Sequence, residues 1–174
     1  MILRTERLIL RPWREQDLID YAELAGDPVA MAPYPATLSR SEAREMIEQL
    51  QAIAASDGFC YSPIERAADG AFLGVAGLAR CADFVEIGWI IAPAFRGKGY
   101  ASETATAWLR HGFETLRLAE ILAFALDGAA ASERLLARLG FAPDPSRDPE
   151  HPEGRRAFAL TREGFRARCS KPAA

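Results

Sequence analysis

The chain has 174 residues, of which 49% are hydrophobic and 26% charged, with a formal net charge of −3 and a pI near 5.5. This length suits one well-buried domain and is short for two, so we expect a single domain over 1–174 with a core at about 5–168. The acidic balance argues against a general nucleic-acid binder. No apolar stretch reaches transmembrane length and the beginning lacks a signal-peptide core, which predicts no membrane partner and a cytoplasmic location. Three widely spaced cysteines without a CxxC pair agree with a reducing compartment and predict no metal site.

The first half of the chain predicts two helices followed by a hairpin. Ser39 and Glu42 form a capping box before the second helix. Pro63 falls inside a predicted strand, which predicts either an edge position or a bulge. The predicted elements are a strand at 7–13, helices at 15–26 and 41–55 with a loop at 31–35 between them, and strands at 59–66 and 71–80 joined by a turn at 68–70.

The second half alternates strands and helices. The last predicted helix is followed by Gly140, a residue that commonly closes helices. The predicted elements are a buried strand at 84–92, a helix at 100–116, a buried strand at 121–126, a helix at 130–139, a loop at 144–154, a strand at 155–161, and a short helix or tail at 162–169. A helix between two buried strands predicts a parallel pair. The whole order predicts a mixed α/β (α+β type) fold with early hairpins and a late βαβ unit.

One segment, Arg96-Gly97-Lys98-Gly99-Tyr100-Ala101, joins the buried strand to the following helix. A strand that runs through a Gly-rich turn into a helix leaves several backbone N–H groups unpaired at the positive end of the helix dipole, which suits a phosphate. The segment lacks the P-loop string, and Ser102 replaces the third glycine of a dinucleotide fingerprint. An ordinary tight connection is the alternative interpretation.

The pattern Arg-x-x-Gly-x-Ala, at Arg96, Gly99 and Ala101, resembles the pyrophosphate-binding motif of the GNAT acyl-CoA-dependent N-acetyltransferases. Two further blocks resemble the RimJ/RimL-like branch of that family, which is named for ribosomal-protein N-terminal acetyltransferases. They are Thr5-Glu6-Arg7-Leu8-Ile9-Leu10-Arg11-Pro12-Trp13 and Ser132-Glu133-Arg134-Leu135-Leu136-Ala137-Arg138-Leu139-Gly140-Phe141. The branch usually has an Asn three residues before the Ser, where this chain has Ala129, so one expected coenzyme contact is missing.

The resemblance implies the GNAT fold, a central and mostly antiparallel sheet in which two neighbouring strands splay apart around the coenzyme. It also implies acetyl-CoA as co-substrate, a primary amine as acceptor and direct transfer in a ternary complex. The implied coenzyme-binding residues are the backbone at Trp89, Ile90 and Ile91, the turn at Arg96, Gly97, Lys98, Gly99, Tyr100 and Ala101, and Ser132. An oxyanion donor is expected among the N–H groups near Trp89 to Ile91.

Glu86 is the first candidate for the general base, because it is the one charged residue in an otherwise apolar strand. The alternatives are that Glu86 faces solvent or pairs with an arginine, in which case a water chain removes the proton. Ser132 is the candidate acid for the leaving thiolate, a hydrogen-bonding partner of the coenzyme sulfur, or merely a helix-capping residue. Tyr34, together with Glu86, is expected at the acceptor site, and a packed surface loop is the alternative for Tyr34.

The acceptor is expected to be a protein N-terminus or a small-molecule amine, and the branch makes a homodimer possible. Two other functions stay open at this point. A non-catalytic acyl-CoA-binding or sensing module would bind the coenzyme without turnover, and a nucleotide-phosphate-binding domain would prefer ATP or NAD.

Overall fold

The computed structural model describes residues 1–126, 128–150 and 154–169. In this part of the chain the strands form one eight-stranded sheet in the order β1-β2-β3-β4-β5-β6-β8-β7. The strands are β1 (Leu3–Arg4), β2 (Leu8–Leu10), β3 (Ser62–Arg66), β4 (Phe72–Cys81), β5 (Phe84–Ile91), β6 (Glu120–Leu126), β7 (Ala142–Pro143) and β8 (Arg155–Thr161). All neighbouring pairs are antiparallel except β5 and β6, which are parallel. The predicted mixed α/β fold with a late βαβ unit is confirmed.

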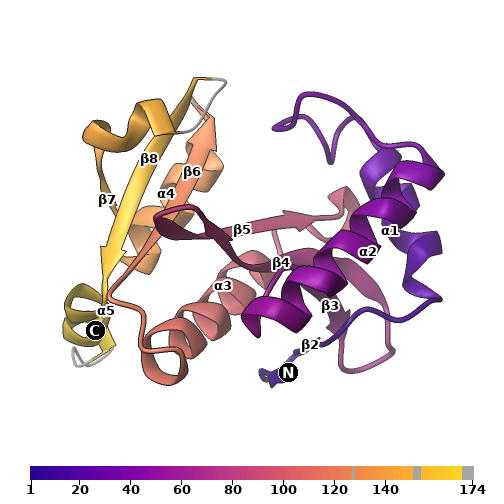
Figure 1. The fold of residues 1–174 in the computed structure, drawn as a ribbon, viewed down its shortest axis with the longest axis horizontal. Coiled ribbons are helices and arrows are strands. Elements are labelled where there is room, and N and C mark those ends of the chain that lie inside the picture. Colours follow the sequence, from indigo (N-terminus) through magenta and orange to yellow (C-terminus); the bar gives the residue numbers. More distant parts are fainter. Residues whose placement is uncertain (127, 151–153, 170–174) are drawn as a thin grey trace.

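The helices are α1 (Asp17–Gly26), α2 (Arg40–Asp57), α3 (Tyr100–Arg110), α4 (Ala130–Leu139) and α5 (Arg162–Cys169), with short turns η1 (Pro93–Phe95), η2 (His111–Thr115, a π-type continuation of α3) and η3 (Pro145–Glu150). None of these helices is both long and apolar enough to cross a membrane. Figure 1 shows α1 and α2 together beside the β2–β4 half of the sheet, whereas α4 lies with β6 and β8.

Two hydrophobic clusters occupy opposite faces of the sheet. One joins the sheet to α3, α4 and α5, and includes Trp108 and Leu136. The other joins it to α1 and α2, and includes Trp13 and Val75. Because successive side chains of a strand point to opposite faces, Val85, Ile87 and Ile91 of β5 join the first cluster and Ile90 packs against the second.

Most predicted elements are confirmed to within a few residues, and the differences have local causes. The first strand is shorter than 7–13, since Pro12 has no N–H to donate and Arg11 turns inward to Asp17. The capping box of Ser39 and Glu42 is present. β3 lies inside the sheet and not at an edge, and its register shifts just after Pro63, between Ile64 and Glu65, so the bulge alternative is correct.

Four short elements escaped the prediction. β1 precedes the first predicted strand, η1 lies between the predicted strand at 84–92 and the helix at 100–116, β7 lies just before the predicted 144–154 loop, and η3 lies inside that loop. Two-residue strands and short 3-10 helices are too short for hydrophobic periodicity to detect. The remainder of the predicted 144–154 loop includes residues 151–153, which lie outside the described part.

The strands β5 and β6 meet at one point. β4 pairs with β5 along its whole length, from Cys81–Phe84 to Gly74–Ile91. By contrast, the only registered pair that the described residues show between β5 and β6 is Glu86–Leu122. Beyond Glu86 the two strands part, and β6 continues paired with β8. The sheet is therefore forked at its centre, with Glu86 at the base of the fork.

Candidate active site

The turn between β5 and α3 presents a row of backbone donors. Gly97 and Gly99 have φ values of +75° and +82°, a region that glycine adopts at low cost. In the described part of the chain, no hydrogen-bond acceptor is recorded for the N–H groups of residues 97–102, whereas the Glu103 N–H donates to the Gly99 carbonyl. Gly99 also offers no side-chain cap to α3. Six consecutive donors without a recorded acceptor at a helix N-terminus would suit an anion.

The two basic side chains of this turn are held by carbonyl groups. Arg96 donates through Nε to the Ile91 carbonyl at 3.0 Å and through Nη2 to the Val29 carbonyl at 3.2 Å. The Lys98 Nζ donates to the Ala94 carbonyl at 3.1 Å. Arg96 therefore ties the turn to the end of β5 and to the α1–α2 loop, while both side chains keep a positive charge close to the free N–H groups.

Arg7 is a third cation at the turn, and the sequence motif that contains it had suggested no role for it. Its Nη1 donates to the Lys98 carbonyl at 3.1 Å, and its Nε donates to Glu103 at 2.7 Å. The guanidinium lies 4.7 Å from the ring centroid of Tyr100, which is itself buried. Arg7 thus fastens the beginning of the sheet to the first turn of α3. The string Thr5-Glu6-Arg7 was visible, but its proximity to the turn was not.

β5 offers further donors along the fork. The Ala92 N–H donates to the Leu73 carbonyl of β4 at 2.9 Å. Bonded residues alternate along an antiparallel pair, so the N–H groups of Trp89 and Ile91 point away from β4 and toward the fork. Ile90 points its N–H to β4, and its side chain packs with the α1–α2 cluster. Trp89 is half-buried against the opposite cluster, and Ile91 is buried there.

Glu86 lies on the α1–α2 face of the sheet. Its neighbours Val85 and Ile87 belong to the cluster of α3 and α4, so the side chain of Glu86 points to the other face. The side chain is half-buried, and one Glu86 oxygen accepts a hydrogen bond of 2.9 Å from the Tyr61 hydroxyl. Among the described residues no arginine is recorded as a partner of Glu86, so the ion-pair alternative finds no support. Tyr61 was missed by the sequence analysis, which contained no signal for it.

Tyr34 lies in the α1–α2 loop, and the residue is 37% exposed. Shielding of its hydroxyl from water raises the pKa of Tyr34, an effect that Arg155 opposes and the charge of Glu86 reinforces. The Arg155 guanidinium lies 5.4 Å from the centroid of the Tyr34 ring and donates to the Pro33 carbonyl at 2.6 Å. The α1–α2 loop is therefore held against the beginning of β8, above the fork.

Ser132 lies on the other side of the sheet. It is half-buried in the first turn of α4, whose Leu135 and Leu136 pack into the cluster opposite Glu86. Neither a cap nor another hydrogen bond is recorded for its hydroxyl within the described residues, so the capping alternative finds no support. Ala129 is the N-cap residue of α4, a position where a methyl group satisfies no donor. The two candidate catalytic residues thus flank the fork from opposite faces.

Cysteine and acidic side chains are possible nucleophiles and metal ligands. Cys60 and Cys81 are free thiols. Burial, followed by the negative charge of Glu86, raises the pKa of Cys81 to about 11, and burial raises the pKa of Cys60 as well. In the segments that the structure describes, no three His, Cys, Asp or Glu side chains come together as metal ligands. His151 lies outside the described residues.

A family model described as an acetyltransferase (GNAT) domain matches residues 7–142, most of the chain. The chain belongs to the GNAT family. It is 32% identical over 148 residues to YoaA of Bacillus subtilis, an uncharacterized N-acetyltransferase, covering 80% of this chain and 82% of YoaA. It is also 40% identical to YnaD of the same organism, an uncharacterized N-acetyltransferase, over 55 residues that make up 32% of each chain.

Solved GNAT structures share the fold over nearly the whole chain. An acetyltransferase from Agrobacterium tumefaciens superposes with a TM-score of 0.81 at 26% identity, covering 92% of this chain and 94% of that one. The spermidine N-acetyltransferase of Vibrio cholerae, solved in complex with CoA and spermine, superposes with a TM-score of 0.76 at 19% identity, covering 92% and 99%. These comparisons identify an acetyltransferase, and the second structure shows the shared fold holding CoA.

Proposed function

We propose that this enzyme transfers the acetyl group of acetyl-CoA to a primary amine by direct attack of the amine on the thioester in a ternary complex. The observation that carries the proposal is the row of free N–H groups from Gly97 to Ser102, directly after a strand whose edge is open. Such a row suits the pyrophosphate of the coenzyme. From there the pantetheine arm would follow the fork toward Glu86.

The nucleotide end of the coenzyme would lie outside the turn. A groove of about 780 Å³ runs along α3, and Gly99, Ser102, Thr106 and Arg138 are among the residues that line it. Gly99 and Ser102 belong to both the groove and the row of donors. A coenzyme whose pyrophosphate occupies the turn would therefore place its nucleotide in contact with hydroxyl groups and with the cation of Arg138.

The reaction needs an oxyanion donor and a proton acceptor. The Trp89 N–H points into the fork and would hold the tetrahedral oxyanion while the amine nitrogen bonds to the carbonyl carbon. Glu86 precedes Trp89 by three residues, about 10 Å along a strand. At this separation, the proton of the ammonium would reach the Glu86 carboxylate through water. Such a transfer combines the two alternatives from the sequence, Glu86 as the base and a water chain.

Breakage of the carbon–sulfur bond releases the thiolate of CoA. A thiol has a pKa near 8.5, so the thiolate leaves with little assistance, and Ser132 would need only to hydrogen-bond the sulfur. A covalent acetyl-cysteine route finds no support, because the raised thiol pKa values leave Cys60 and Cys81 protonated and poorly nucleophilic at neutral pH. Direct attack is the better explanation.

The terminal motifs favour the RimJ/RimL-like branch, and with it either a protein N-terminus or a small amine as the acceptor. We further propose that the chain forms a single domain and acts in the cytoplasm, as a monomer or as a homodimer. The competing function is an acyl-CoA sensor, which is favoured by one observation: Ala129 replaces the Asn that usually contacts the coenzyme.

The deciding experiment mixes the protein with acetyl-CoA and a panel of amines, and measures the thiol released. The panel holds N-terminal peptides, polyamines, amino sugars and amino-acid derivatives. We expect release with at least one class and CoA binding by calorimetry. Tight CoA binding without turnover on any amine supports the sensor, and binding of ATP or NAD in place of CoA contradicts both functions.

A further inference from the structure

A pair of glycines creates a slot on the α1–α2 face of the sheet. Gly77 of β4 and Gly88 of β5 are registered partners, so any side chains on them would point to the same face. A Cβ atom on Gly77 would lie 2.4 Å from the Cys60 carbonyl oxygen and 2.5 Å from the Tyr61 Cα. A Cβ atom on Gly88 would lie 2.7 Å from the Tyr61 hydroxyl. The backbone of Tyr61 therefore passes over Gly77, and its phenol ring lies over Gly88.

The slot directs the phenol to Glu86. Glu86 and Gly88 are two residues apart on β5 and share a face, so a ring that lies on Gly88 extends toward the carboxylate. The Tyr61 hydroxyl donates to Glu86 Oε1 at 2.9 Å, the one hydrogen bond recorded for this carboxylate in the described residues. The other oxygen, Oε2, stays available at the base of the fork.

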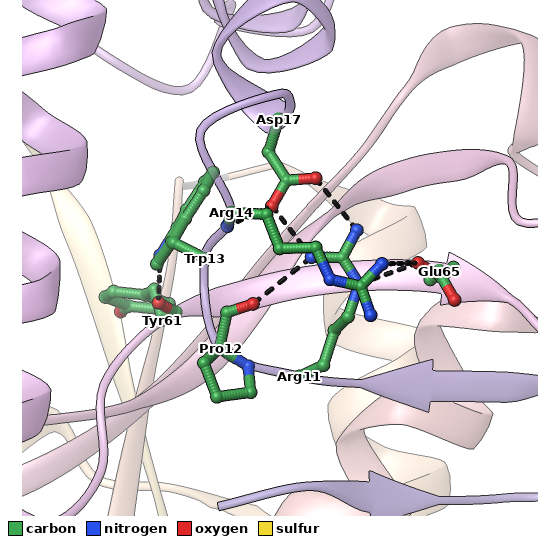
Figure 2. Close-up of polar contacts among 7 residues, drawn as sticks. All are labelled: Arg11, Pro12, Trp13, Arg14, Asp17, Tyr61 and Glu65. Carbon is green, nitrogen blue, oxygen red and sulfur yellow. Dashed lines mark hydrogen bonds and ion pairs between the residues drawn. The ribbon is translucent and has the colours of Figure 1, made fainter.

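Residues of the N-terminal motif at 5–13 hold the backbone of Tyr61 and the strand that follows it. The Trp13 indole N–H donates to the Tyr61 carbonyl at 3.0 Å, as Figure 2 shows. Next to it, the buried Arg11 binds Asp17 through two hydrogen bonds of 2.7 and 2.8 Å and binds Glu65 of β3 at 2.6 Å. These bonds join the β2–α1 connection to β3, the strand that follows Tyr61.

Several groups share this environment with Glu86. They are Tyr61 before β3, Tyr34 from the α1–α2 loop and Cys81 of β4, with Arg155 of β8 acting on Tyr34. Burial, with the charge of Glu86 next, raises the pKa of Tyr61 well above its ordinary value. Tyr61 therefore keeps its proton at neutral pH and acts as a donor, which excludes it as the base.

We propose that Tyr61 is a positioning residue for Glu86: its phenol occupies Oε1 and leaves Oε2 as the oxygen that receives the proton of the acceptor. This inference rests on the proposed function of Glu86. It also assigns a purpose to the Gly77–Gly88 pair and to Trp13, which the sequence motif alone left without a role.

The first test needs no acceptor and so stands apart from the proposed function. The carboxyl carbon of Glu86 is followed by ¹³C NMR during a pH titration, and its signal is assigned by its loss in Glu86→Gln. The phenol donates to the ionised carboxylate and so favours that form, and loss of the donor in Tyr61→Phe should therefore move the titration of Glu86 to higher pH. An unchanged titration in Tyr61→Phe overturns the proposal.

Tyr21→Phe is the matched control. Tyr21 is also a buried tyrosine of the α1–α2 cluster and packs edge-on against Trp13 at 5.0 Å, but no interaction with Glu86 is recorded for it in the described residues. We expect Tyr21→Phe to leave the Glu86 titration unchanged. A shift equal to that of Tyr61→Phe would show that any lost hydroxyl in the cluster has this effect, and would contradict the specific role of Tyr61.

Gly88→Ala tests the slot while the hydroxyl is retained, and covers the case in which Tyr61→Phe does not fold. The added methyl group would displace the phenol from Glu86, so the upward shift should recur. An unchanged titration in a folded Gly88→Ala variant overturns the slot. Trp13→Phe, which removes the indole donor and part of the buried ring, should give a smaller shift of the same sign.

Kinetic measurements then test whether the Tyr61–Glu86 hydrogen bond affects catalysis. Once an acceptor is found, Tyr61→Phe should lower kcat about tenfold and move the acidic limb of the rate profile upward, with the KM for acetyl-CoA unchanged. A Glu86→Gln variant with a pH-independent defect would refute the proposed role of Glu86 as the base, on which this inference rests. A normal Glu86→Gln pH effect with a native profile in Tyr61→Phe would refute only the role of Tyr61.

Discussion

The two sides of the proposed active site are built differently. The coenzyme turn consists of backbone N–H groups from one continuous segment, residues 97–102. The acceptor side consists of side chains from separate segments: Glu86 of β5, Tyr61 before β3 and Tyr34 after α1. The turn needs only its glycines and the helix that follows. The acceptor side depends on every contact that holds its members together, from the glycine slot to Trp13.

The two sides should therefore tolerate substitutions differently. Backbone N–H donors remain when side chains change, so the turn can keep the same ligand while its sequence varies. Side-chain constellations change with each substitution, and so they can be adapted to different acceptors. The predictions below test whether the two sides respond independently.

The largest expected effect comes from a negative charge in the turn. Like charges about 4 Å apart near a protein surface repel by about 4 kcal/mol, so Gly97→Asp should weaken acetyl-CoA binding by about 1000-fold in calorimetry. Gly70→Asp is the matched control, because Gly70 has the same φ of +75° and the same open surroundings in the β3–β4 turn. If both variants bind equally well, the pyrophosphate does not occupy the turn.

The second-largest effect concerns stability, and it comes from the ion pairs of the buried Arg11 with Asp17 and Glu65. Arg11 is 4% exposed, and Arg11→Met leaves the buried Asp17 without its cation, so the free energy of unfolding should fall by about 3 kcal/mol in urea. Arg14→Met is the control: Arg14 pairs with the same Glu65 as Arg11 but is exposed, and should cost less than about 1 kcal/mol. Equal losses would contradict the role assigned to burial.

Glu86→Gln should affect the rate in a pH-dependent way. At pH 6 the amine is protonated and needs a base, so the rate should fall about 100-fold. As the pH rises through the pKa of the amine, about 8 for an α-amine or about 10 for a lysine-like amine, the defect should disappear. Acetyl-CoA affinity should stay native, and Glu45→Gln on the exposed surface of α2 is the control. A constant defect across pH would remove Glu86 as the base.

Ser132→Ala should have the smallest effect. A thiolate is a tolerable leaving group, so kcat should fall by less than about fivefold if Ser132 only hydrogen-bonds the sulfur. Ser56→Ala, at the exposed end of α2, provides the comparison for thiol-release kinetics. A loss of about 100-fold would instead identify Ser132 as a general acid, and would make the α4 side as important to the chemistry as Glu86.

Local patterns were sufficient for much of the molecule. The helix at 130–139 and the strand at 155–161 were predicted to the residue, because hydrophobic periodicity and a closing glycine are visible in a short window. The turn at Gly97 and Gly99 was equally visible, because its donors are consecutive in the chain. What this sequence determined by itself is therefore the order of its longer elements and the backbone conformation of one glycine-rich turn.

Only the tertiary structure decided the rest. It brought Arg7 to the coenzyme turn across 91 positions of sequence separation and Tyr61 to Glu86 across 25. It also turned Arg11 inward, which shortened the first strand. These contacts depend on sheet register and on the space above Gly77 and Gly88, and both are properties of neighbouring strands that no single segment encodes.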